Sequence, residues 1–188
     1  MNKSTLAMAF SMAIFGLAST SVSAIDGNIN FLGEVTDTTC LINGTTPNGA
    51  VDVNVNLKAV QASSLSSSGT TANATPFKIT LGGPGDLNCT NGKIAAVYFE
   101  PNSPAIDKTT GWLKNIETTN PASRVQVQIL NGETNDAINL LTGVGNIAPK
   151  TIAGNTAEYN YFGQYIAVDG AATPGKVAST VRYSIVYQ

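Results

Sequence analysis

The sequence contains no histidine, one tryptophan and two cysteines, and only 12% of its residues are charged. Histidine is the commonest general base and metal-binding side chain, so its absence excludes the usual catalytic triads and zinc sites. The acidic residues are scattered along the chain, which disfavours the paired carboxylates that glycoside hydrolysis needs. We therefore expect no catalytic residue, no metal site and no cofactor.

The charge balance also excludes two classes of partner. Ten basic and 12 acidic residues give a formal net charge of −2, and there is no basic run. A protein that binds nucleic acid or an anionic membrane through its charge needs a basic surface. The glycine-rich stretch at residues 82–85 lacks the Lys-Ser/Thr pair and the following helix of a phosphate-binding loop, so it predicts a turn.

Residues 1–24 have the features of a secretion signal. Lys3 supplies a positive charge, residues 6–18 are mostly apolar, and Val22-Ser23-Ala24 offers small residues for cleavage. The apolar run, about a dozen residues long, is too short to span a bilayer as a stable helix. We expect residues 1–24 to be removed and the rest, which is the size of one domain, to be exported.

The two cysteines, Cys40 and Cys89, both follow this signal. In an oxidising, exported compartment an even pair is more often a disulfide than two free thiols. Closing a loop of about 50 residues would stabilise the fold by about 4 kcal/mol in the chain-entropy model.

Alternation of apolar and polar residues recurs along the chain, whereas helical periodicity is scarce, so the sequence predicts an all-β sandwich. Residues 93–99 are more continuously apolar than the other strands and predict a strand buried on both faces. Residues 124–130 place valine and isoleucine on one face and Gln126 and Gln128 on the other. Turn signals such as Asn43-Gly44 separate the strands, and the Ser/Thr-rich residues 61–75 predict a surface loop with at most one helical turn. The predicted strands comprise residues 51–57, 76–81, 93–99, 124–130, 157–168 and 176–188.

The two ends of the predicted mature chain both form strand patterns. At the carboxyl end, alternate residues from 177 to 187 are mostly apolar, whereas termini usually fray. At the amino end, residues 25–35 (IDGNINFLGEV) alternate in the same way with no neighbouring turn to bring them a partner. An unpaired apolar strand is an aggregation hazard, so this strand needs a partner elsewhere.

These features, in this order, resemble the pilin subunits of chaperone–usher fimbriae, the surface fibres of Gram-negative bacteria. The resemblance spans the whole chain. It rests on the signal, the pattern Gly-x-Ile-x-Phe-x-Gly-x-Val at residues 27–35, the two cysteines, the aromatic strand around residues 159–166, and the ending VRYSIVYQ with its penultimate Tyr187. Leu32 and the long Ser/Thr-rich loop depart from the family pattern without undermining it.

The resemblance implies an incomplete immunoglobulin-like β-sandwich that lacks its last strand. It divides the chain into a signal (1–24), a donor-strand extension (25–35) and a pilin domain (36–188). The missing strand comes from a periplasmic chaperone and then from a neighbouring subunit, after passage through an outer-membrane usher. The implied donor residues, with Gly27 over a shallow pocket and Gly33 at the base of the strand, are Ile25, Gly27, Ile29, Phe31 and Gly33. The implied acceptor residues, with a terminal carboxylate for the chaperone, are Val181, Tyr183, Ile185, Tyr187 and Gln188.

The function that the resemblance implies is that of a structural subunit of a fimbria, exported to the cell surface, which polymerises by donor-strand exchange and supports adhesion. Two alternatives remain at this point. A minor adaptor or carbohydrate-binding tip subunit is the first, although a tip subunit normally carries an additional lectin domain and lacks a donor strand. A secreted hydrolase is the second, and the lack of histidine disfavours it. The sequence leaves open which side chains of the terminal strand face the groove and which face the core.

Overall fold

The computed structural model describes residues 40–46 and 51–188. The chain divides into two units, Met1–Val35 and Thr36–Gln188, and every described residue belongs to the second unit. The predictions for residues 1–24 and 25–35 therefore lie outside the described residues. In the part that is described, no helix is long and apolar enough to cross a membrane.

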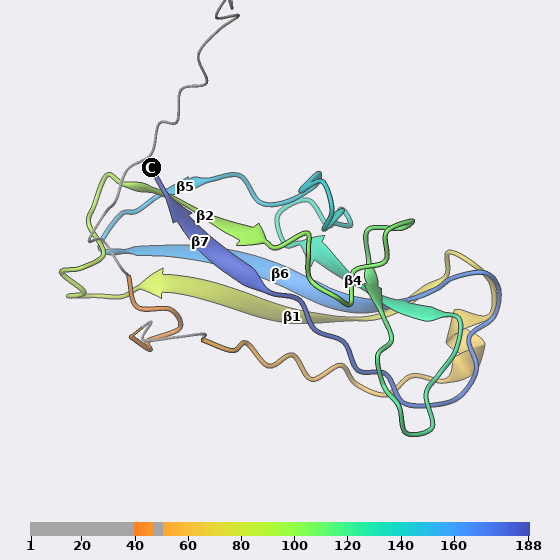
Figure 1. The fold of residues 1–188 in the computed structure, drawn as a ribbon. Coiled ribbons are helices and arrows are strands. Elements are labelled where there is room, and N and C mark those ends of the chain that lie inside the picture. Colours follow the sequence, from red (N-terminus) through yellow and green to blue (C-terminus); the bar gives the residue numbers. More distant parts are fainter. Residues whose placement is uncertain (1–39, 47–50) are drawn as a thin grey trace, which may run out of the picture. The chain divides into compact units, whose positions relative to one another are not determined.

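The described residues form two antiparallel sheets, drawn as a ribbon in Figure 1. The four-stranded sheet has the order β1-β6-β4-β3 and the three-stranded sheet the order β5-β2-β7. One short 3-10 turn, η1, lies within the predicted Ser/Thr-rich loop, but β1 begins at Thr71, so the loop is shorter than the predicted residues 61–75. The elements are η1 (Ala62–Leu65), β1 (Thr71–Gly82), β2 (Ile94–Phe99), β3 (Leu113–Lys114), β4 (Val125–Asn131), β5 (Lys150–Thr151), β6 (Thr156–Ala167) and β7 (Tyr183–Tyr187).

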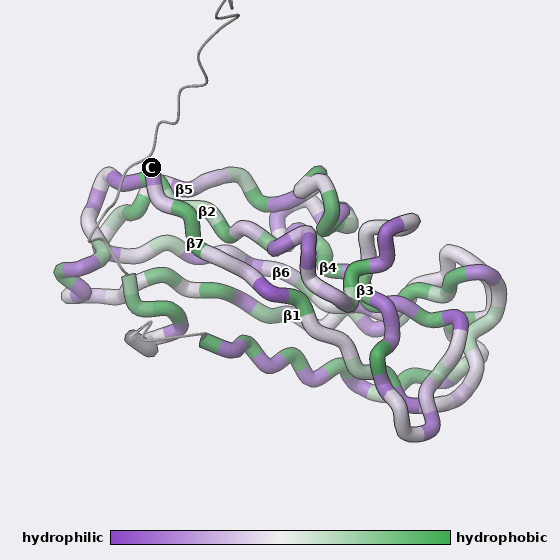
Figure 2. The backbone as a smooth tube through the Cα atoms, in the orientation of Figure 1, coloured by the Kyte–Doolittle hydropathy of each residue, from purple (hydrophilic) through white to green (hydrophobic). Residues whose placement is uncertain are grey.

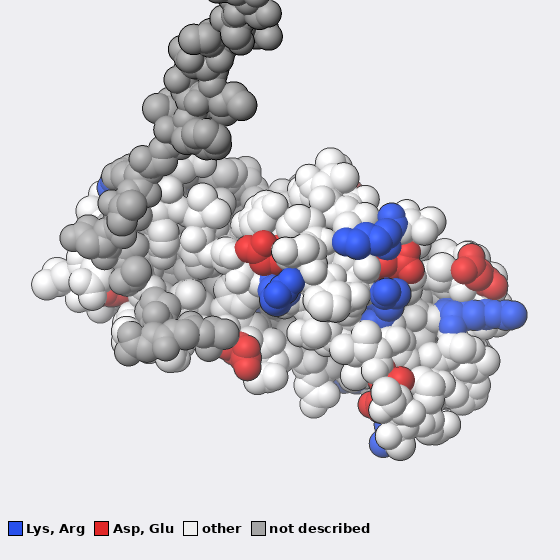
Figure 3. Space-filling view, in the orientation of Figure 1, with Lys and Arg blue, Asp and Glu red and all other residues white. Residues whose placement is uncertain are grey.

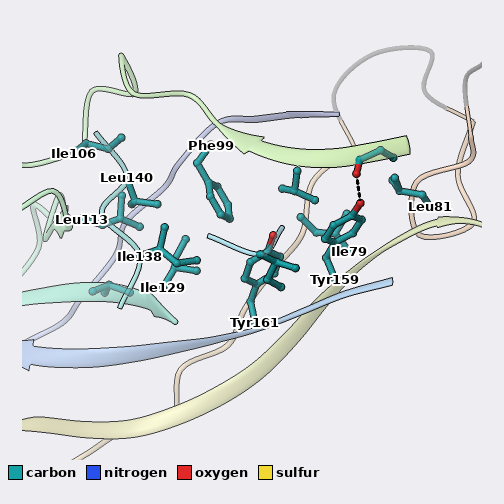
Figure 4. Packing of buried hydrophobic residues seen from close by; sticks show 14 of the residues in the cluster. Ile79, Leu81, Phe99, Ile106, Leu113, Ile129, Ile138, Leu140, Tyr159 and Tyr161 are labelled. Atoms are coloured by element: carbon teal, nitrogen blue, oxygen red, sulfur yellow. Dashed lines mark hydrogen bonds between the residues drawn. The ribbon is translucent and has the colours of Figure 1, made fainter. Parts of the chain in front are cut away.

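The core lies between the sheets and is built around the tyrosines of β6 (Figure 4). Tyr159 and Tyr161 are almost fully buried, with 0% and 1% of their surface exposed. The Tyr159 hydroxyl donates to the Ala95 carbonyl of β2 at 2.6 Å, which joins the two sheets and satisfies a buried polar group. The Tyr161 ring packs edge-on against Phe99 of β2, with 5.5 Å between ring centroids. These contacts confirm the predicted aromatic strand.

Strand β4 is buried on both faces although its sequence alternates. Gln126 and Gln128, which the alternation placed opposite the apolar residues, are 7% and 4% exposed. Their side-chain carbonyls accept hydrogen bonds from the Thr110 hydroxyl at 2.7 Å and the Gln164 amide at 2.8 Å. Because these partners satisfy the amides, β4 is buried on both faces despite its polar residues.

Strand β2 is less buried than its sequence predicted. Its continuous apolar run predicted burial on both faces, but alternate residues are exposed: Ile94 by 38% and Tyr98 by 46%. Ala95, Val97 and Phe99 face the core instead. The outer face of β2 is therefore uncovered, and an apolar run alone did not indicate this.

The turn predicted at Asn43-Gly44 is present. Both residues have positive φ, +49° and +77°, which a two-residue hairpin of type I′ requires. Ile42 and Thr45 close this turn through two backbone hydrogen bonds of 2.9 Å each. The Ile42 backbone also pairs with Leu81 of β1, which attaches this short hairpin to the four-stranded sheet.

Candidate functional site

Strand β7 has one paired edge and one open edge. It lies at the end of the three-stranded sheet, and β2 is its only neighbour among the described strands. Its even-numbered residues bond toward β2: Gln188 and Ile94 exchange hydrogen bonds of 2.8 and 2.9 Å, and the Glu100 amide donates to the Arg182 carbonyl at 2.9 Å. Backbone groups alternate in direction along an antiparallel strand. The amides and carbonyls of residues 183, 185 and 187 therefore point away from β2, along what we call the open edge.

The side chains of the same odd-numbered residues point inward. Tyr183, Ile185 and Tyr187 are half-buried and pack against the core, as do Val177 and Val181 just before the strand. The sequence left open whether these side chains face the core or the groove. The structure places them on the core side of the strand that carries the open edge. Only residues 183–187 are assigned as strand, so the predicted strand over 176–188 was too long.

A second segment without a ladder partner lies across from the open edge. Residues 51–58, which we call the border segment, alternate between half-buried and exposed side chains. Val53 and Leu57 pack against the core. The segment is the orange trace that precedes η1 in Figure 1, and Figure 2 shows its alternating hydropathy. The predicted strand over residues 51–57 is wrong as an assignment, because no described strand pairs with the segment, although its predicted alternation is correct.

Two side-chain hydrogen bonds hold the border segment at its ends. The Tyr183 hydroxyl of β7 donates to the Val51 carbonyl at 2.6 Å. The Asn73 amide of β1 donates to the Lys58 carbonyl at 3.0 Å. Between these ends the segment lies over Gly163 of β6, where an added Cβ would come within 3.2 Å of Leu57 Cδ2. A methyl group at Gly163 would therefore require the end of the Leu57 side chain to shift by a few tenths of an ångström.

A cavity of about 450 Å³ lies where the border segment ends and the carboxyl-terminal segment begins. Its wall is mainly apolar, and the side chains of Glu117 and Lys176 also line it. The amide of Thr119 and then that of Thr118, together with the charge of Lys176, lower the pKa of Glu117. The apolar wall includes Leu57, Val60, Leu65, Val125, Tyr165 and Val177.

The predicted disulfide is present between Cys40 and Cys89, and both residues are fully buried. It ties residues 40–46 to the loop that follows β1, where the Leu41 amide donates to the Asp86 carboxylate at 2.9 Å. Burial raises the pKa of the Tyr187 phenol, the charge of Asp86 raises it further, and the Cys40 backbone opposes the shift. The amino-terminal part of the domain and the open edge therefore lie close together.

The site has few charged groups around it. In the face shown in Figure 3, acidic and basic side chains are scattered and form no patch of one sign. Burial raises the pKa of the Tyr183 phenol, and the charge of Asp52 adds to the shift. No group of three or more His, Cys, Asp or Glu side chains suited to a metal ion occurs within residues 40–46 and 51–188. Apolar packing and backbone pairing, rather than charge, are what the site offers a partner.

Sequence reasoning found the terminal strand but missed Asn73, Gly163 and the cavity. Asn73 has φ +57° and lies where the β1–β6 register shifts, between Ala72 and Thr75. Asparagine tolerates this left-handed conformation better than most residues, but it is too common in this sequence to mark one position. Gly163 carried a weak signal as an isolated glycine inside a strand, which often marks a close approach of another segment.

The family model and the known proteins that resemble this chain are all fimbrial proteins. Residues 57–188 match the model of the FimA family, described as type-1 fimbrial protein, A. The F17 fimbrial protein of Escherichia coli is 40% identical over 182 residues, which cover 95% of this chain and 97% of that protein. The major fimbrial subunit SMF-1 of Stenotrophomonas maltophilia is 38% identical over 173 residues, covering 89% and 95% respectively.

Two solved structures confirm the fold class. The P pilus rod subunit PapA aligns with a TM-score of 0.52 at 15% identity, covering 79% of this chain and 99% of that chain. A subunit from the structure of a chaperone–usher pilus aligns with the same TM-score and identity, covering 90% and 100%. The fold is the predicted immunoglobulin-like β-sandwich of such subunits, and the chain belongs to the type-1 fimbrial protein family.

Proposed function

We propose that this chain is a structural subunit of a fimbria and that it polymerises by donor-strand exchange. Residues 25–35 of one copy would lie between the open edge of β7 and the border segment of the next copy. The proposal rests on two facing segments, residues 51–58 and residues 183–187. In both segments alternate side chains point toward the core. Among the described residues, neither segment has a backbone partner on the side that faces the other.

The chemistry of the open edge defines what can occupy it. An extended chain is needed to pair with the outward amides and carbonyls of β7, and strand addition to a sheet edge is a known mode of recognition. The inward face of that chain must be apolar, because its side chains would meet the half-buried residues of β7 and the border segment. The stretch IDGNINFLGEV meets both requirements through Ile25, Ile29 and Phe31.

The energy of such an exchange is large enough to hold a polymer. Burying Ile25, Ile29 and Phe31 contributes about 1.5–3 kcal/mol each. Several ladder hydrogen bonds add about 0.5–1.5 kcal/mol apiece. The gross interaction is then on the order of 10 kcal/mol before ordering costs. The apolar cavity beside Leu57 and Val177 supports the proposal, since it offers one further side chain a place at the end of the site.

The geometry of the exchange favours an open filament. The donor strand and the acceptor edge are different surfaces, so each contact is head-to-tail, and such contacts give a filament unless they close into a ring. The proposed partners are therefore neighbouring copies or other pilin subunits, a periplasmic chaperone that covers the open edge before assembly, and an outer-membrane usher. The proposed destination is a surface fimbrium that supports adhesion, reached through the periplasm.

The family confirms that the chain is not an enzyme, since its members are structural fimbrial subunits. It also bears on the choice between a shaft subunit and a tip subunit. SMF-1 is named a major fimbrial subunit, and it aligns over 95% of its own length. We therefore favour a repeating shaft subunit over a carbohydrate-binding tip.

The test replaces the apolar face of the donor strand. Ile29→Asp with Phe31→Asp should abolish fibres on the cell surface, because two charges would have to enter an apolar site. The matched control is Asn28→Asp with Asn30→Asp, which adds the same charges to the opposite face of the same strand. Fibres are measured by electron microscopy and by shearing them from cells, and the exported subunit is measured in periplasmic extracts.

The control variant should assemble fibres, whereas the Ile29/Phe31 variant should remain exported but unassembled. Normal fibres from the Ile29/Phe31 variant would overturn donor-strand exchange through this face. Loss of fibres from both variants would also count against it, since the effect would then not depend on the inward face.

A further inference from the structure

The border segment is held in place by an unusual set of contacts. Strands of a sheet are normally positioned by a ladder of backbone hydrogen bonds to a neighbour. Residues 51–58 take part in no such ladder with described residues, and β7 is not their backbone partner. The polar contacts described for this segment are the two side-chain hydrogen bonds at its ends, to the carbonyls of Val51 and Lys58.

The identity of these two donors is informative. Val51 lies opposite β7, but its carbonyl accepts from the phenol of Tyr183 and not from a β7 backbone amide. Neighbouring strands lie about 4.8 Å apart, so two strands that flank a vacant position lie about 10 Å apart. A long side chain can bridge that wider gap, whereas a backbone amide cannot. The Tyr183 side chain thus links the two borders at a place where no backbone hydrogen bond among the described residues does so.

Asn73 fixes the opposite end of the border segment from a different sheet. Its positive φ belongs to the register shift in β1, and its side-chain amide reaches the Lys58 carbonyl. Gly163 contributes to the depth of the segment between these ends, because an added Cβ would lie 3.2 Å from Leu57 Cδ2 and that side chain would have to shift. Contacts within the described residues therefore act on both ends and on the depth of the border segment.

We propose that Tyr183 and Asn73 are positioning residues that hold the border segment one strand's width from β7, so that the site for an incoming strand is formed in advance. This inference rests on the proposed donor-strand exchange and adds residues that set its rate. Preorganisation of a site reduces the cost of ordering it on binding. Once a strand has entered, its own ladder holds the border segment, and the two side-chain bonds matter less. Their loss should therefore slow association much more than it speeds dissociation.

The experiment measures capture of a fluorescent peptide with the sequence of residues 25–35. The acceptor is the full chain carrying Ile29→Asp and Phe31→Asp, which prevents it from donating to another copy. Tyr183→Phe removes only the hydroxyl, and Asn73→Gly keeps a residue that tolerates positive φ while removing the amide. The control is Tyr159→Phe, which also loses a hydroxyl bonded to a backbone carbonyl at 2.6 Å, but in the core and away from the border segment.

Tyr183→Phe and Asn73→Gly should each lower the association rate roughly two- to tenfold, the range that one neutral hydrogen bond allows. Their dissociation rates should change less than twofold, and Tyr159→Phe should leave the association rate unchanged even where it lowers stability. Unchanged association in both positioning variants, or a loss that falls mainly on dissociation, would overturn the assignment. A parallel loss in Tyr159→Phe would also overturn it, because the effect would then follow stability.

A second readout does not depend on binding. Lys58 is exposed, and trypsin cleaves after lysine, so the Lys58 carbonyl that Asn73 holds belongs to a cleavable bond. Cleavage after Lys58 should be roughly two- to tenfold faster in Asn73→Gly than in the acceptor chain. Equal cleavage would refute the role of Asn73 in holding the segment. If the acceptor chain without a further substitution captures no peptide, the proposal of donor-strand exchange is refuted. The cleavage rates then still decide whether Asn73 positions the border segment.

Discussion

The two sheets of the sandwich differ in how completely their strands are paired. In the four-stranded sheet, β6 has a neighbour along both edges, and β4 is buried on both faces because even its glutamines find partners. In the three-stranded sheet, β7 has a neighbour on one edge, and its inward side chains stay half-buried. An open edge of this kind is usually blocked by charges, bulges or a covering segment.

The difference indicates that the core between the two sheets provides the stability and the open edge of β7 provides the interface. The buried tyrosines and Ile79 concentrate apolar burial between β1, β6 and β2, away from the open edge. The border segment then lies over β6 without pairing with it.

The largest expected effect comes from making the same substitution in each sheet. Ile79 is 1% exposed, so Ile79→Ala should lower the free energy of unfolding by about 2–5 kcal/mol. Ile185 is only half-buried in the single chain, so Ile185→Ala should cost about 1–2 kcal/mol. Urea denaturation of the full chain with Ile29→Asp and Phe31→Asp measures both values.

Saturating peptide of residues 25–35 then sharpens the comparison. Its binding should stabilise the chain with Ile79→Ala as much as the parent, but should stabilise the chain with Ile185→Ala less, because Ile185 would contact the peptide. Equal costs for the two substitutions without peptide would mean that β7 is already as well packed as β1. Equal stabilisation by peptide would place the peptide elsewhere.

The pH dependence should be next in size, and it too separates the sheets. Burial raises the pKa of Tyr159, Tyr161 and Tyr165 in β6 and of Tyr183 and Tyr187 in β7. A phenol whose pKa is raised by folding stays neutral in the native state, while the unfolded chain ionises above about pH 10. Stability should therefore be full below pH 10 and fall as the pH rises through the native pKa values.

The β7 phenols should respond to an incoming strand, and the core phenols Tyr159 and Tyr161 of β6 should not. The titration uses a Tyr165→Phe background, because Tyr165 lines the cavity at the end of the site. Ultraviolet titration of the chain with and without the peptide of residues 25–35 should show two tyrosines whose ionisation moves to higher pH when peptide is bound. Tyr183→Phe and Tyr187→Phe assign these two. A peptide-dependent shift in a variant that lacks both would contradict the placement of the open edge.

The sequence predicted the apolar faces well and the pairing poorly, for a physical reason. Alternation over residues 51–57 depends on local residue choice, so it was visible, whereas a strand assignment depends on a partner that no described residue supplies. The disulfide was predicted from the number of cysteines and the turn at Asn43-Gly44 from two adjacent residues, and the structure confirms both. The burial of Gln126 and Gln128 depends on Thr110 and Gln164, which are distant in sequence, so the alternation of β4 did not reveal that its polar face is also buried.

In the candidate site too, features that depend on neighbouring residues were predicted, and contacts between distant residues were not. The inward residues of β7 followed from alternation near the end of the chain. The bonds from Tyr183 to Val51 and from Asn73 to Lys58 join residues separated by 132 and 15 positions, and nothing local marks them. The donor residues of 25–35 lie outside the described residues and stay a prediction.

The smallest expected effect on stability comes from Gly163→Ala, which adds one methyl group beneath the border segment. The new Cβ would lie 3.2 Å from Leu57 Cδ2, so the end of that side chain must shift by a few tenths of an ångström. A glycine replaced at ordinary φ also gains about 0.4–1 kcal/mol from the unfolded chain, which offsets the crowding. The net change in unfolding free energy should therefore stay within about 1 kcal/mol.

Peptide association should nevertheless slow in Gly163→Ala, because the displaced Leu57 also lines the cavity at the end of the site. Gly83→Ala is the control, since a Cβ there meets nothing within 4 Å, and its association rate should equal that of the parent. If Gly163→Ala captures peptide as fast as Gly83→Ala, the depth of the border segment does not govern entry of the strand.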